Sequence, residues 1–160
     1  MRKIFIISLM VLTITLLFSG CTHKSSKEFW VHFQNADNHI TKSTALRGEI
    51  VASIQSNDYD NADKLLAIKM GYDKLSIKEL TEASKNTDDR NLKEFLEYMK
   101  KSVEFMKLDD NKLSDAIKTG RDGNSGETTE YLNDALKYRN QAGETLKKAR
   151  SLYWVDDSKK

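Results

Sequence analysis

The chain contains no proline in 160 residues, and this absence constrains its fold more than any other feature. Proline interrupts a helix most strongly, because it lacks the backbone N–H and its ring clashes with the preceding turn. Apolar residues recur at spacings of three and four along most of the chain, whereas no strand-like alternation persists beyond a few residues. Hydrophobic residues make up 39% of the chain, which is enough for one packed core. The sequence therefore predicts an all-α domain.

The N-terminal region has the layout of a secretory signal peptide. Two basic residues, Arg2 and Lys3, precede an apolar run over residues 4–18. Cys21 follows this run and is the only cysteine in the chain. The segment Leu17-Phe18-Ser19-Gly20-Cys21 resembles the lipobox of bacterial lipoproteins, except that phenylalanine stands at position 18, where leucine is commoner.

The resemblance implies that a signal peptide, residues 1–20, is removed and that Cys21 becomes a lipid-bearing N-terminus. In that class of protein the thiol carries diacylglycerol, with acyl chains such as palmitate, and residues 21–27 would form a lipidated tether. Two acyl chains anchor stably, because each buried methylene contributes about 0.8 kcal/mol. An uncleaved transmembrane anchor is the alternative, but the apolar run would span only about 22 Å of a hydrocarbon core about 30 Å thick. The resemblance thus implies a location on the extracytoplasmic face of the cell membrane.

The charge balance argues against a nucleic-acid partner. The full chain has 26 basic and 24 acidic residues, and residues 1–20 contain two of the basic ones and no acid. The mature chain would therefore carry 24 of each and be formally neutral. Basic and acidic residues are also interspersed, with no basic run long enough to indicate a polybasic patch. We therefore expect no binding to nucleic acid, and membrane contact through the lipid anchor.

Amphipathic segments occupy residues 28–154, which we predict to be the folded domain. Their apolar stripes run over residues 29–54, 59–80, 92–117 and 132–153. The third stripe alternates spacings of four and three, as the seam of a coiled coil does. Four such segments joined by short loops bury their apolar stripes best in an antiparallel four-helix bundle. A two-hairpin arrangement or a domain-swapped dimer would bury the same faces, and residues 155–160 are predicted to be a frayed tail.

Several local signals mark where these helices begin and end. A capping box at Ser25-x-x-Glu28 opens the first helix, and Asp58 is the predicted start of the second. The second segment contains Gly71 and another capping box at Ser76, so it is compatible with one helix or with two shorter ones. Residues 119–125 contain the clearest loop signal in the chain.

The residue types and spacings that usually carry catalysis are missing. The sequence has no nucleophile elbow, no phosphate-binding glycine loop and no Cys–His pair. The spaced glycines Gly120, Gly123 and Gly126 follow no strand, so a loop between helices is the better interpretation. His32 and His39 share one helix face, but a metal site would need a further ligand from another helix, and we expect exposed histidines instead. We therefore predict no enzymatic activity, no cofactor and no metal.

Charged residues occupy stripe positions where the repeat calls for apolar ones. Arg47, Asp110 and Arg139 do so clearly, and Lys69 and Asp73 do so less cleanly. In an antiparallel bundle all five would lie within about one turn of a common level, given the predicted loops. Charges inside a bundle are costly unless paired, which favours a structural register device or a ligand site. A third possibility is a helix break at residues 108–111 that exposes Asp110.

These observations lead to two functional hypotheses of different kinds. The first is a non-catalytic, lipid-anchored binding or interaction module at the cell surface, with another envelope protein as its partner. The second is a receptor for a small anionic ligand, held between helices by Arg47 and Arg139. An open cavity lined by these arginines would favour the receptor, whereas a layer closed by internal ion pairs would favour the interaction module.

Overall fold

The computed structural model describes residues 25–154 of the chain. Helices account for nearly all of this range, and the only β-type pairing within it is an isolated bridge between Ser25 and Thr87. The four helices are α2 (Lys27–Gln55), α3 (Tyr59–Lys85), α4 (Arg90–Arg121) and α5 (Ser125–Trp154). The predicted all-α class is confirmed.

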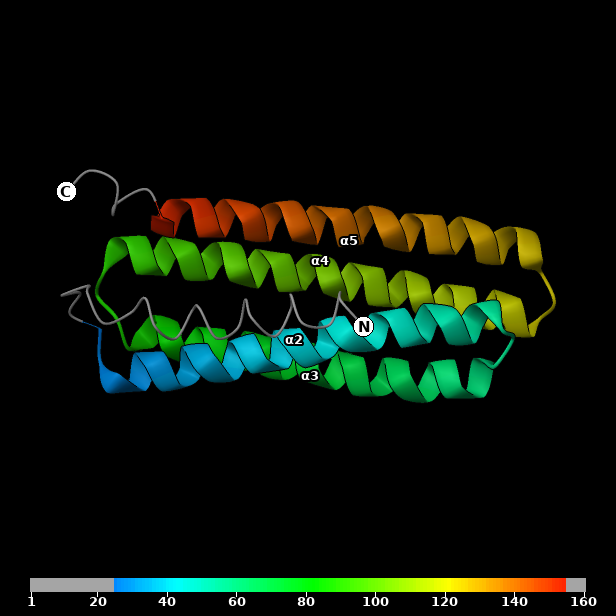
Figure 1. The fold of residues 1–160 in the computed structure, drawn as a ribbon, viewed down its shortest axis with the longest axis horizontal. Coiled ribbons are helices and arrows are strands. Elements are labelled where there is room, and N and C mark those ends of the chain that lie inside the picture. Colours follow the sequence, from blue (N-terminus) through cyan, green and yellow to red (C-terminus); the bar gives the residue numbers. More distant parts are fainter. Residues whose placement is uncertain (1–24, 155–160) are drawn as a thin grey trace, which may run out of the picture.

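The four helices lie side by side and alternate in direction, so one chain supplies a complete antiparallel bundle (Figure 1). The start of α2, the connection from α3 to α4 and the end of α5 share one pole, which we call the proximal pole. The connections at residues 56–58 and 122–124 share the opposite, distal pole. The predicted antiparallel four-helix bundle is therefore confirmed.

The bundle is built from two tightly packed hairpins. The backbones of α2 and α3 run close together, as do those of α4 and α5, and the contact between α3 and α4 joins the two pairs. Two apolar clusters fill the interior. The proximal cluster includes Phe29, Leu80 and Leu96, and the distal cluster includes Ile50 and Leu113. Because loops this short force neighbouring helices to run antiparallel, the local sequence dictates the hairpins.

The first helix begins one residue later than the predicted capping box. Ser26, not Ser25, is the N-cap, and its hydroxyl oxygen accepts a hydrogen bond from the backbone N–H of Phe29 at 3.2 Å. The same hydroxyl donates to the carbonyl oxygen of Asn86 at 3.1 Å. Residues 25–27, the last part of the predicted tether, are therefore held on the bundle next to the α3–α4 connection, because the Ser26 hydroxyl bonds to groups of both segments.

Three further boundary predictions can be judged against the helices. Asp58 is confirmed as an N-cap, since its carboxylate accepts from the backbone N–H of Asn61. α3 is one continuous helix, so the kinked alternative is wrong; the Ser76 hydroxyl donates to the Tyr72 carbonyl within the helix instead of capping a new one. α4 also runs unbroken to Arg121, which shortens the predicted loop at 119–125 to residues 122–124.

The predictions for the two ends of the chain lie outside the described residues. They are the signal peptide at 1–20, the lipid attachment at Cys21 with the first part of the tether, and the frayed tail at 155–160. Within residues 25–154, none of the helices combines the length and the apolar character needed to cross a bilayer.

Candidate functional site

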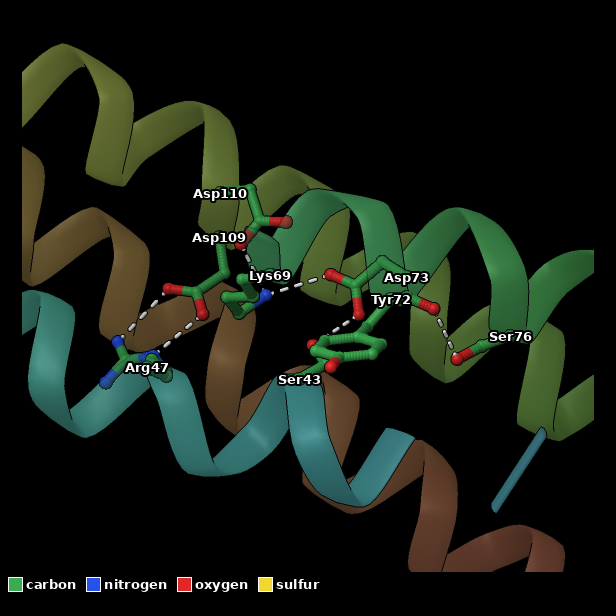
Figure 2. Close-up of polar contacts among 8 residues, drawn as sticks. All are labelled: Ser43, Arg47, Lys69, Tyr72, Asp73, Ser76, Asp109 and Asp110. Atoms are coloured by element: carbon green, nitrogen blue, oxygen red, sulfur yellow. Dashed lines mark hydrogen bonds and ion pairs between the residues drawn. The ribbon is translucent and has the colours of Figure 1, made fainter. Parts of the chain in front are cut away.

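A layer of charged side chains separates the two apolar clusters near the middle of the bundle. Its paired members, drawn in Figure 2, are Ser43, Arg47, Lys69, Asp73, Asp109 and Asp110. They come from α2, α3 and α4, and we call them the charged layer. Because Asp110 is 1% exposed and α4 is continuous, the third possibility, a helix break that exposes this carboxyl, is wrong.

Lys69 lies at the centre of the charged layer and is completely buried. Its Nζ donates to Asp73 Oδ2 at 2.9 Å on the same helix and to Asp110 Oδ1 on α4. The other oxygen of Asp73 accepts a hydrogen bond from the Ser43 hydroxyl of α2. The ammonium group thus joins α3 to α4, and Asp73 extends the contact to α2, so the buried charge is paired and hydrogen-bonded.

Arg47 forms the second ion pair of the layer, with Asp109 rather than Asp110. Its Nε donates to Asp109 Oδ2 at 2.7 Å, and a terminal nitrogen donates to Asp109 Oδ1 at 3.1 Å. This two-point contact crosses from α2 to α4, and Asp109 is fully buried. Bidentate pairs of arginine and carboxylate are among the strongest polar contacts in proteins, and they fix the relative positions of both partners.

Asp110 holds a proton far more readily than an ordinary carboxyl. Its pKa is raised from 3.8 to about 8: burial is the main cause and the neighbouring Asp73 acts in the same direction, while Lys69 opposes both. Its Oδ2 atom is buried and has no hydrogen-bond partner among the described residues. Lys69 carries one positive charge between two carboxyl groups, so a proton on Asp110 makes this trio neutral.

Arg139 of α5 lies at the edge of the layer and is only partly buried. Burial lowers the pKa of its guanidinium, and so does repulsion by Arg47, while Asp109 and Asp73 act in the opposite direction. No ion pair to Arg139 is present in the part of the chain that the structure describes. It is the one member of the predicted set that is brought near the layer without a bonded partner there.

The five residues singled out from the sequence gather at one level, but their partners differ from those expected. Asp110 meets Lys69 and not an arginine, and Arg47 meets Asp109, which the sequence reasoning missed. A signal for Asp109 was present: Ser102, Asp109 and Ala116 are spaced by seven on α4, and all three are buried. Small or polar residues at such spacing beside an apolar seam indicate a second buried edge of the helix.

Comparison with known proteins adds no family to this picture. The chain matches no family model, no curated protein and no solved structure.

The histidines are less exposed than predicted. His32 Nδ1 lies 2.7 Å from Glu79 Oε2 across α2 and α3, and this contact lowers the pKa of Glu79. His39 stacks against the Tyr72 ring with centroids 5.8 Å apart, and its Nδ1 is buried with no partner among the described atoms. Within residues 25–154, no three metal-binding side chains of the His, Cys, Asp or Glu type come together.

The charged layer does contain a hydroxyl beside a carboxylate, which is a combination that can support nucleophilic chemistry. Ser43 is completely buried, however, and Asp73 already accepts from both Ser43 and Lys69. A substrate would have to displace bonds that hold three helices together. The charged layer is therefore closed to a substrate. Its polar groups bond to one another and hold the protein's own helices together.

Proposed function

We propose that this protein is a lipid-anchored module that binds a partner protein at the extracytoplasmic face of the cell membrane, without catalysis. The signal-peptide layout and the lipobox-like segment ending at Cys21 support the anchor. The closed charged layer carries the non-catalytic part of the proposal, because its buried acids and bases are used on one another. The neutral charge of the mature chain supports a protein partner over nucleic acid.

The start of the bundle determines how such a molecule would stand on the membrane. Because Ser25 and Ser26 are attached to the α3–α4 connection, only residues 22–24 would separate Cys21 from the bundle. Fully extended, these residues span about 10 Å. The proximal pole would therefore lie against the lipid surface, and the distal pole would stand off by the length of α2, whose 29 residues span about 43 Å.

Apolar side chains on the flanks of the rod favour another envelope protein as the partner. Ile68 and Leu75 are 51% and 41% exposed, and they are seven residues apart on one face of α3. Leu136 on α5 is 49% exposed. Exposed apolar residues on a helix face are the usual anchors of helix-mediated protein contacts.

The anchor is tested by replacing Cys21 with serine and following the protein in cells. The wild-type chain should incorporate labelled palmitate and sediment with membranes, and Cys21→Ser should incorporate none and either be released or persist as a precursor. Recovery of Cys21→Ser in membranes at the mature mass would refute the anchor. A crosslinker placed at Ile68 tests the partner, with one at Glu104 on the exposed face of α4 as the matched control.

A second candidate function, a receptor for a small anion, is favoured by Arg139 alone. This guanidinium is partly buried, lies close enough to Arg47 for mutual repulsion and has no ion pair among the described residues. An anion between the two arginines would relieve that repulsion. Inorganic phosphate should then raise the Tm of the wild-type protein at constant ionic strength and leave that of Arg139→Met unchanged. Equal shifts in both proteins would dismiss this receptor.

A further inference from the structure

The distal pole contains a cavity of about 300 Å³ that the charged layer and the proposed anchor do not involve. It lies where the two distal connections approach each other, and its walls come from the ends of all four helices. None of its ten lining residues carries a charge, although 31% of the chain is charged. Its volume is at the lower end of the range for small-molecule sites, about 300–1,000 Å³.

Hydrogen-bonding groups and apolar surface alternate around this cavity. Gln55, Asn57 and Thr129 supply amide and hydroxyl groups, while Ile54 and Leu132 supply apolar walls. The Asn57 side-chain oxygen accepts from the Tyr59 hydroxyl at 2.7 Å, so its NH₂ group remains as a donor. The Thr129 hydroxyl donates to the Ser125 carbonyl at 2.9 Å, so its oxygen remains as an acceptor.

The backbone is shaped to place these groups. A Cβ atom at Gly120 would lie 2.5 Å from the Tyr59 ring, so only glycine lets this ring rest on α4. Asn57 and Gly123 both adopt positive φ, at 61° and 81°, in the two distal connections. Asparagine and glycine are the residues that tolerate this conformation best. Two of the spaced glycines noted in the sequence, Gly120 and Gly123, thus line the cavity.

Arg121 and Asp58, two charged residues of the same pole, have partners outside the cavity. Arg121 donates to Asp60 at 3.0 Å and to Asp63 at 2.7 Å on the α3–α4 face. The Asp58 carboxylate caps α3. With neither a cation nor an anion among its lining residues, the cavity has no means of compensating a charged ligand, whose desolvation would be costly.

We propose that the distal cavity binds a neutral carbohydrate ring. Such a ring presents several hydroxyl groups, which match the amide and hydroxyl groups of Gln55, Asn57 and Thr129. Its C–H faces match the apolar walls and the Tyr59 ring, which combines an apolar body with a polar end. The source of the ring is either a free sugar or the end of a glycan chain, and both share this chemistry.

The test is saturation-transfer NMR on the full chain, in micelles of a detergent without a sugar head group. The probes are glucose, galactose, mannose and N-acetylglucosamine, each with its methyl glycoside, and charged glucuronate and glucosamine. At least one neutral sugar should receive saturation from the protein, and the two charged sugars should receive at least five-fold less. Binding of the methyl glycoside indicates a glycan end, and a requirement for the free anomeric hydroxyl indicates a free sugar.

Two variants with a matched control assign the signal to the cavity. Thr129→Glu places a charge on an exposed lining residue and should reduce the transfer at least five-fold, and Gly120→Ala should do the same by displacing Tyr59. Gly143→Ala, where an added Cβ meets nothing within 4 Å, should leave it unchanged. Absence of transfer to every neutral sugar, or full transfer in a folded Thr129→Glu, overturns the proposal. Cys21→Ser should bind the sugar normally, so failure of the anchor and failure of the cavity give different results.

Discussion

The charged layer and the proximal apolar cluster are equally buried at their centres, yet they hold the helices together in different ways. Lys69 in the layer and Leu96 in the cluster are both completely inaccessible. Leu96 is stabilised by non-directional contacts that would accept several neighbouring helix positions. Lys69 is stabilised only where two carboxyl groups meet its ammonium group. Equal burial therefore need not mean an equal role. The apolar clusters supply stability, and we infer that the charged layer fixes the register of the helices.

The largest expected effect comes from removing the central cation of the layer. Lys69→Met should lower the free energy of unfolding by about 3–5 kcal/mol at pH 7, because it leaves Asp73 and Asp110 buried without a positive charge. Urea denaturation followed by circular dichroism measures the loss. A combined Ser43→Ala, Lys69→Met, Asp73→Leu and Asp110→Leu variant should recover much of it, since an apolar layer of similar volume is usually no worse than an ion pair. If Lys69→Met left the free energy of unfolding unchanged, the residues of the charged layer would not be energetically coupled.

The matched substitution in the apolar cluster should cost a similar amount for a different reason. Leu96→Ala should lower the free energy of unfolding by about 3 kcal/mol, from lost burial and a residual cavity. This loss should be the same at pH 5 and pH 9, because no titrating group contacts the cluster through Leu96. The loss caused by Lys69→Met should instead be smaller at pH 5, where the stranded carboxyl groups can protonate. Parallel pH dependence in the two variants would remove the distinction between the regions.

A third expected effect is the contribution of Asp110 to the pH dependence of stability. The pKa of Asp110 is about 8 in the folded protein, above its ordinary value of 3.8, so the folded state binds the proton more tightly than the unfolded state. The stability that this group contributes is full below about pH 4 and is lost progressively as pH rises toward 8. Asp110→Asn should remove this slope. Urea midpoints of the two proteins between pH 4 and 9 give the comparison, and identical slopes would contradict it.

The smallest effect is expected at the edge of the layer. Arg139→Met should change the free energy of unfolding by less than about 0.5 kcal/mol, because the guanidinium has no bonded partner in the described chain and is repelled by Arg47. Arg47→Met is the control and should cost several times more, since it strands the buried Asp109. Thermal denaturation of both variants at pH 7 separates the cases. A loss above about 1 kcal/mol for Arg139→Met would make this arginine a structural member of the layer.

Much of the fold could be predicted because its determinants are local. The apolar stripes, the absence of proline and the polar connections each depend on neighbouring residues, and together they required four helices that alternate in direction. The predicted helix ends differ from those in the structure by one to three residues, as at Ser26 and Arg121. The reason is that the last turn of a helix depends on partners from other segments. Ser26, for example, is held by Asn86, which is 60 residues away.

In the candidate site, the local sequence predicts the level of the charged residues but not which of them form ion pairs. The sequence by itself determined that charges would stand on the helix stripes at one level, since the positions of Arg47, Lys69 and Asp110 follow from helical periodicity, but it left open whether Asp110 would be buried. Only the tertiary structure decided that Lys69 forms an ion pair with Asp110 and that Arg47 forms one with Asp109. The physical reason is that periodicity gives the direction of a side chain to within about 100°, whereas an ion pair requires two charged groups within about 4 Å. That distance depends on the rotation and spacing of whole helices, which the packing of every other core residue fixes.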